Sequence, residues 1–268
     1  MTGSRTWQAW RLSLGTLTCL PVRPPTAVDA AIARGAILLA PLAVLPLAGL
    51  VLAVVSAGRE LDLPFAVVGL VAVGALAAGS RALHWDGLSD TVDALTSSYD
   101  ATRSLAVMRS GAAGPAGVVA VVVVLGTQAL CLGTLAATER GAVLAAVGVV
   151  ASRGALALCC LRFVRPARED GLGATFARSV PAPMAAVLWL GLAAALAATG
   201  SWAGLDWWRG ALAATLAVAV SAALLARATS RFGGVTGDVF GACVELSLAT
   251  PTNGPSGRSP RRTEPSSA

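Results

Sequence analysis

The chain has 268 residues, of which 56% are hydrophobic and only 13% are charged. Soluble domains are about 25% charged, so the composition excludes an ordinary water-soluble fold. All 20 basic residues are arginine and the net charge is +6, which in an apolar chain predicts basic loops facing the cytoplasm and anionic lipid. An aromatic content of 5% argues against a nucleic-acid partner.

Six apolar runs are long enough to cross a bilayer, since a transmembrane helix needs about 20 residues. They cover residues 30–55, 63–82, 115–137, 142–161, 181–200 and 210–226. We therefore expect an all-α fold, a polytopic integral membrane bundle of about six helices. A seventh run, 239–249, is shorter and is interrupted by Glu245, so it fits an interfacial or re-entrant helix better.

The arginines fall unevenly between the two sets of connections that six spans create. One set holds only Arg59, Arg140 and Arg209, while most of the others lie in the second set and near the termini. The positive-inside rule then predicts a multi-pass cell-membrane protein with both termini in the cytoplasm. Residues 1–250 are expected to form one catalytic membrane domain, and the Pro-, Ser- and Arg-rich residues 251–268 a disordered cytoplasmic tail.

An acidic stretch, 84–93, follows directly on the second apolar run. If it is helical, Asp86, Asp90 and Asp93 stand at i, i+4 and i+7 and share one face. Such a group predicts a site for Mg²⁺ or Mn²⁺, since oxygen ligands suit these ions better than Zn²⁺. The alternative is a solvated face or a set of helix caps. His84, the only histidine, is either a packed polar residue or a group that contacts substrate or transfers a proton.

A second acidic segment lies at 231–245. Its glycine-rich turn, with Gly234, Thr236 and Gly237, precedes Asp238 and could bind phosphate, although it lacks the Gly-Lys end of a Walker A loop. Asp238 and Glu245 share a helical face at i and i+7. The predicted topology puts this segment on the same side of the membrane as the first acids, which predicts one metal and phosphate site.

Three arginines are candidates for phosphate contacts. Arg109 and Arg231 lie beside glycine-rich turns on the predicted cytoplasmic side, where an ordinary basic loop is the competing interpretation. Arg153 falls inside the fourth apolar run, where a charge is costly and normally has an acidic or functional partner.

Two motifs resemble a known family. Residues 83–95, LHWDGLSDTVDAL, are similar to the LHxDGLxDTxDxx signature of cobalamin synthases, also called adenosylcobinamide-GDP ribazoletransferases, and GGVTGD at 233–238 resembles their second motif. Weaker support comes from TCLPV at 18–22 and DGLG at 170–173. A third family pattern is matched at four loop positions, Met108, Arg109, Gly114 and Gly117. Ser110 stands where that pattern often has an acid.

The resemblance implies a magnesium-dependent phosphoryl transfer. The 5′-hydroxyl side of α-ribazole, or its 5′-phosphate, is expected to attack the phosphoryl group of adenosylcobinamide-GDP next to the corrinoid arm. GMP then leaves, and adenosylcobalamin or its 5′-phosphate forms. The implied metal ligands are Asp86, Asp90 and Asp93, with Asp238 and Glu245 completing the Mg²⁺ site or orienting the hydroxyl. His84 is a further catalytic candidate, and Arg109, Arg153 and Arg231, with Gly234, Thr236 and Gly237, are candidates for substrate contacts.

Two alternatives remain at this point. CDP-alcohol phosphotransferases also cluster aspartates beside a membrane. Their Asp-Gly-x-x-Ala-Arg pattern is not matched here, because Asp90 follows Ser89 at the position where that pattern has Ala. A secondary transporter would have acids near the middle of its spans and an internal repeat. The expected partners are the small-molecule substrates and the lipid bilayer, and the sequence is compatible with a homo-oligomer.

Overall fold

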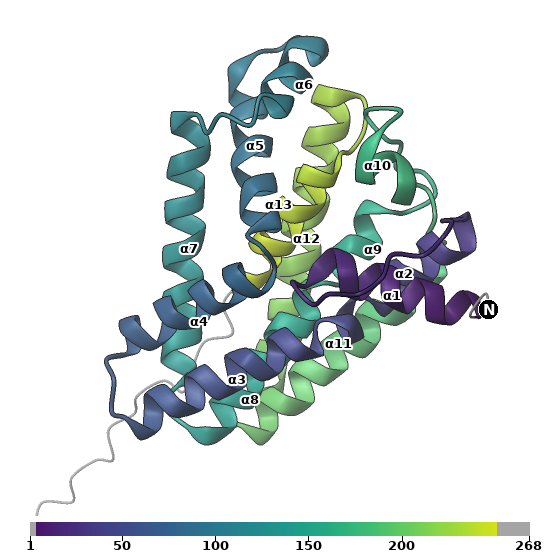
Figure 1. Ribbon diagram of the computed structural model, residues 1–268. Coiled ribbons are helices and arrows are strands. Elements are labelled where there is room, and N and C mark those ends of the chain that lie inside the picture. The colour runs from purple at the N-terminus through teal and green to yellow at the C-terminus, as the bar shows by residue number, and fades with distance from the viewer. Residues whose placement is uncertain (1–3, 251–268) are drawn as a thin grey trace, which may run out of the picture.

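The computed structural model describes residues 4–250, so the predicted tail lies outside the described residues. This part is built from helices, and only two isolated bridges, Leu161 with Val180 and Pro166 with Val235, have strand-like pairing (Figure 1). The helices are α1 (Arg5–Leu17), α2 (Ala30–Ala43), α3 (Leu45–Glu60), α4 (Phe65–Gly79), α5 (Leu83–Ser97), α6 (Ala101–Arg109), α7 (Pro115–Leu135), α8 (Glu139–Ser152), α9 (Ala155–Cys159), α10 (Gly171–Phe176), α11 (Ala182–Trp202), α12 (Trp207–Phe232) and α13 (Gly237–Leu248). The all-α expectation is confirmed.

Five stretches of helix in the described residues are long and apolar enough to span a membrane. They are α2 with α3, α7, α8 with α9, α11 and α12. The second predicted run, 63–82, differs, because α4 has only 15 residues and the chain bends by 94° into α5. Arg81 and Ala82 adopt left-handed backbone angles at this bend, which no regular helix can continue through. The apolar run at 63–82 is therefore not one continuous helix, and α4 with α5 forms a bent pair that brings the number of candidate spans in the described residues from five to six if the pair crosses the membrane together.

The acidic segments lie on two helices that pack closely against each other, α5 and α13. A Cβ on Gly87 of α5 would lie 2.7 Å from the backbone oxygen of Asp238, and one on Gly241 of α13 would lie 2.9 Å from the Cα of His84. Each glycine therefore allows the backbone of the other helix to approach. This reciprocal contact sets the distance between the two acidic segments.

Helix α13 lies inside the bundle rather than on its surface. Val239, Ala242, Cys243 and Val244 are all fully buried, and the helix contacts α5, α9 and α12 (Figure 1). The 239–249 segment is therefore enclosed by other helices of the bundle. In contrast, α7 exposes a row of valines, Val118, Val119, Val122 and Val123, as a lipid-facing helix does.

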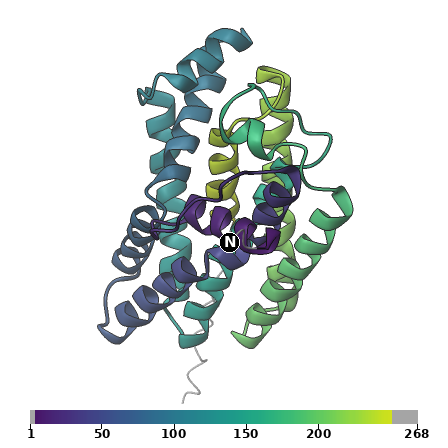
Figure 2. The same cartoon turned by 45° about the vertical axis from the view of Figure 1, so that its right-hand side comes forward.

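The bundle has two ends that match the two predicted sets of connections. At one end Arg59 contacts Glu139 at 3.4 Å, and Arg140 donates a hydrogen bond to the Trp202 carbonyl. The opposite end is formed by α6, the 161–170 connection and the turn after α12. Figure 2 turns the α1 and α2 pair toward the viewer, with the 161–180 segment close to it.

Candidate functional site

Three carboxylates from the two acidic segments lie close together. Asp86 and Asp90 project from α5, and Asp238 lies in the first turn of α13. Asp86 and Asp238 are among the charges that act on Asp90, whose side chain is only 8% exposed. The carboxylates of Asp86 and Asp90 have no hydrogen-bond or ion-pair partner among the described residues. Such unneutralised acids form a strongly electronegative spot.

Asp238 has a cationic neighbour, Arg168, that was not among the predicted site residues. Arg168 Nη2 donates to Asp238 Oδ2 at 3.2 Å. Burial raises the pKa of the Asp238 carboxyl above its ordinary value and Asp86 adds to this shift, while Thr236 and Arg168 act against it. The site thus combines uncompensated carboxylates with a guanidinium, which is the mixture that a metal-bound or polarised phosphate requires.

The connection that holds Arg168 is fixed by the glycine-rich turn. The Val235 amide donates to the Arg165 carbonyl, and the Ala167 amide donates to the Val235 carbonyl, both at 2.9 Å. A Cβ on Gly234 would lie 2.3 Å from the Arg165 oxygen, so only glycine allows this pairing. Gly234 therefore packs against backbone, and its role is to bring Arg168 to Asp238.

Thr236 and Gly237 lie at the start of α13. The Thr236 hydroxyl accepts a hydrogen bond from the Val239 amide and so caps this helix, and it donates to the Met108 sulfur. Gly237 lines the cavity described below. The turn predicted to bind phosphate thus mainly stabilises the start of α13, and it places Asp238 at the N-terminus of this helix.

Asp93 lies at a different place from the other acids of α5. Its two carboxylate oxygens accept hydrogen bonds from the Gly114 amide at 2.7 Å and the Gly117 amide at 2.8 Å. A Cβ on either glycine would collide with that carboxylate. Asp93 therefore caps the N-terminus of α7, which is a favourable position for a negative charge. Of the predicted loop positions, Met108 and Arg109 end α6, and Gly117 is in the first turn of α7.

Glu245 faces a second polar cluster in the core. The His84 Nδ1 atom lies 3.5 Å from one Glu245 oxygen, and Gln128 Nε2 donates to the other at 2.7 Å. Arg153 is 1% exposed, donates to the Ser152 hydroxyl, and its charge acts on both His84 and Glu245. Arg153 therefore has the acidic counterpart expected of a charge inside a span. Arg153 lies in the core of the bundle and not beside the three carboxylates, where a phosphate contact was predicted.

The five predicted metal ligands consequently do not form one cluster. Residues i and i+7 share a helical face but stand about 10 Å apart along the axis, so neither Asp86 and Asp93 nor Asp238 and Glu245 can contact one ion together. Among residues 4–250, no three Asp, Glu, His or Cys side chains are arranged to hold a metal. Asp86 and Asp90 still suit Mg²⁺, which often takes one or two carboxylates and completes its shell with water and substrate phosphates.

The other two predicted phosphate contacts serve local structure. Arg109 forms an exposed ion pair with Asp170 at 2.7 Å. Arg231 donates to the carbonyls of Leu95 and Ser98 at the end of α5, and its guanidinium lies over the Tyr99 ring. Arg231 thus stabilises the C-terminus of the acidic helix.

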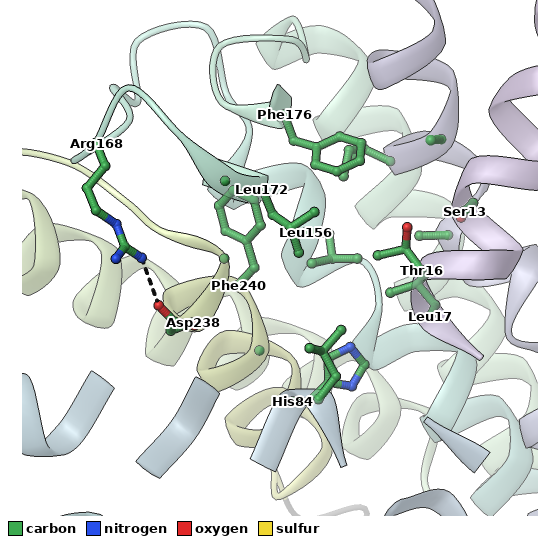
Figure 3. A pocket seen from close by; sticks show the side chains of 17 residues that line it. Ser13, Thr16, Leu17, His84, Leu156, Arg168, Leu172, Phe176, Asp238 and Phe240 are labelled. Carbon is green, nitrogen blue, oxygen red and sulfur yellow. Dashed lines mark hydrogen bonds and ion pairs between the residues drawn. The ribbon is translucent and has the colours of Figure 1, made fainter. Parts of the chain in front are cut away.

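A cavity of about 260 Å³ opens beside Asp238 (Figure 3). Figure 3 shows Arg168 and Asp238 on one side of it, His84 at another, and Leu156, Leu172, Phe176 and Phe240 between them. Residues of α1 and α2 complete the wall. The sequence did not predict this cavity, because helices far apart in the chain build it.

Comparison with known proteins gives a consistent result. A family model described as cobalamin-5-phosphate synthase matches residues 9–251. A Nocardioides sp. protein named adenosylcobinamide-GDP ribazoletransferase is 56% identical over 241 residues, which cover 90% of this chain and 95% of that protein. Proteins of the same name from Frankia casuarinae and Pseudomonas paraeruginosa are 38% and 36% identical, over 89% and 75% of this chain and 91% and 80% of their own. No solved structure matches the chain significantly.

Proposed function

The chain belongs to the cobalamin-5-phosphate synthase family, and we propose that it is an adenosylcobinamide-GDP ribazoletransferase acting in the final steps of cobalamin biosynthesis. It joins adenosylcobinamide-GDP to α-ribazole, or to its 5′-phosphate, and releases GMP. The observation that carries this proposal is the convergence of Asp86 and Asp90 with the Asp238–Arg168 pair beside a cavity.

The reaction balances as a phosphoryl transfer. A ribose hydroxyl forms a new bond to the phosphorus attached to the corrinoid arm, and the bond between that phosphorus and the GMP oxygen breaks. Since the 5′-phosphate substrate gives a product that keeps its 5′-phosphate, the attacking hydroxyl is another one on the ribose and not the 5′-hydroxyl expected from the resemblance. The protein has to position these groups and neutralise charge on the phosphoryl oxygens.

The described residues divide these tasks. Asp238 accepts a hydrogen bond from the attacking hydroxyl and takes its proton, for which a pKa above the ordinary aspartate value is suitable. Arg168, held beside Asp238, donates to a phosphoryl oxygen. His84 borders the same cavity and is oriented by Glu245, so it can contact the ribazole.

Magnesium is part of this proposal. Asp86 and Asp90 would hold Mg²⁺ together with the substrate phosphates, because their carboxylates have no partner among the described residues. When bound, the ion neutralises negative charge on the diphosphate. Asp93 and Glu245 are not needed as ligands, since both are hydrogen-bonded elsewhere.

The site is proposed to face the cytoplasm. The end of the bundle that carries it also carries most of the arginines, and the positive-inside rule places such connections on the cytoplasmic side. Both termini would then be cytoplasmic, and both polar substrates could reach the site without crossing the bilayer.

The test is a transfer assay on the purified protein in detergent or nanodiscs. Adenosylcobinamide-GDP and α-ribazole are supplied with Mg²⁺, and GMP and the corrinoid product are measured together. We expect equal amounts of both, and loss of both when EDTA removes the metal. Absence of a corrinoid product, or release of GMP without it, would overturn the proposed function.

A further inference from the structure

We propose that the cavity beside Asp238 binds the planar aromatic base of α-ribazole, with the ribose directed toward Asp238 and Arg168. This inference rests on the proposed function and assigns one of its two substrates to a defined place. The cavity is bounded by α1, α2, α5, α9, α10 and α13.

The lining of the cavity has the chemistry of a pocket for an aromatic ring. Most of its wall is aliphatic or aromatic, formed by Leu17, Ile37, Leu156, Leu172, Phe176 and Phe240. Phenylalanine rings offer stacking or edge contacts to a flat base, and the leucines exclude water from it. The diphosphate of the other substrate would be poorly solvated among these side chains.

The polar groups of the cavity are confined to parts of its wall. Asp238 and Arg168 lie together on one side, and His84 lies at another (Figure 3). Ser13 and Thr16 of α1 add two hydroxyls. A ligand with an apolar ring and a polar sugar matches this arrangement, because its ring can fill the apolar part while the sugar hydroxyls reach Asp238.

The size of the cavity excludes the corrin macrocycle. Pockets for drug-sized ligands measure about 300–1,000 Å³, and a corrinoid is larger than such ligands. The cavity has about 260 Å³, so the macrocycle of adenosylcobinamide-GDP cannot enter it. The bicyclic benzimidazole base of α-ribazole is small enough.

The position of the cavity also agrees with the geometry of the reaction. Asp238 lines it and is among the charges acting on Asp90, so a hydroxyl next to Asp238 lies beside the proposed Mg²⁺ and diphosphate site. The base in the cavity would hold that hydroxyl in place, which is how binding energy from a remote part of a substrate serves catalysis.

The first variant narrows the cavity. Ala36 of α2 lines it and is 3% exposed, so Ala36→Leu places a larger side chain against the base. We expect KM for α-ribazole to rise about 10-fold to 200-fold, the range that a methylene-sized misfit causes in an apolar pocket, with KM for adenosylcobinamide-GDP unchanged. The matched control is Ala186→Leu on the exposed face of α11, for which neither constant should change.

The second variant widens the cavity, and its expected result cannot be explained by misfolding. Leu172 of α10 is 39% exposed, so Leu172→Ala is expected to fold. It should accept a ribazole analogue with a tricyclic base that the unchanged protein rejects, and a misfolded protein cannot gain this ability.

The outcomes separate the two proposals. If the unchanged protein makes no corrinoid product, the proposed function fails. If it turns over but Ala36→Leu leaves KM for α-ribazole unchanged and Leu172→Ala gains no tricyclic substrate, the cavity inference fails alone. An acyl chain of the bilayer as the true occupant would give this second result.

Discussion

Replacing Gly87 by alanine should separate the two helices that carry the site. The new Cβ would lie 2.7 Å from the Asp238 backbone oxygen and 2.9 Å from its Cα, whereas ordinary contacts begin at 3.4 Å. The start of α13 must therefore move by about 0.7 Å relative to α5, since backbone atoms cannot rotate away. A 1 Å misplacement of reacting groups can cost about 100-fold in rate.

We therefore expect kcat for Gly87→Ala to fall by about 10-fold to 100-fold. The overpacking should also cost about 1–3 kcal/mol in the free energy of unfolding. The measurement is steady-state GMP release, with thermal unfolding recorded on the same preparation. The matched control is Gly74→Ala on α4, where a Cβ meets nothing within 4 Å. Undiminished kcat in Gly87→Ala would refute the argument that this glycine sets the spacing of the site.

Three further predictions concern the acids, the arginine and the topology. Asp93→Ala should lower the free energy of unfolding by about 1–3 kcal/mol, because the amides of Gly114 and Gly117 at the start of α7 lose their acceptor. A changed Mg²⁺ half-saturation in the folded protein would contradict the role of Asp93 as a cap. Arg168→Gln removes a cation that lowers the pKa of Asp238. The pKa of Asp238 should therefore rise, and the acid limb of the pH–rate profile should move to higher pH. An unshifted limb would exclude Asp238 as the proton acceptor. In a background without exposed native cysteines, Ser97→Cys should react with an impermeant thiol reagent only from the cytoplasmic side and Asp62→Cys only from the outside, and the reverse pattern would invert the topology.

The helices were largely predictable from the sequence, but the bend between α4 and α5 was not. Apolar runs of sufficient length identify spans because the bilayer requires internally hydrogen-bonded helices. The run 63–82 met this criterion as well as the others. Its residues include no proline after Pro64, and they did not predict the left-handed backbone at Arg81 and Ala82. That backbone is fixed by tertiary packing.

The closeness of the two acidic segments was predictable from the sequence, but the contacts of the individual acids were not. Periodicity identified the common face of Asp86, Asp90 and Asp93, but a face extends along the axis, and Asp93 reaches α7 while Asp86 and Asp90 remain unpaired. Likewise, Glu245 lies two turns deeper than Asp238 and meets His84. The ion pair of Arg168 with Asp238 was not predicted, because the place of Arg168 depends on the pairing of Arg165 and Ala167 with Val235.

The central claim is phosphoryl transfer at the carboxylates shared by α5 and α13, and Asp90→Asn tests it most directly. The substitution keeps the shape of a side chain that is 8% exposed and removes its charge. With Asp62→Asn at the other end of the bundle as the control, we predict a fall in kcat of at least about 100-fold, since a catalytic metal site contributes several kcal/mol. Corrinoid product formed by Asp90→Asn at the unchanged rate, with the same dependence on Mg²⁺, would contradict the account.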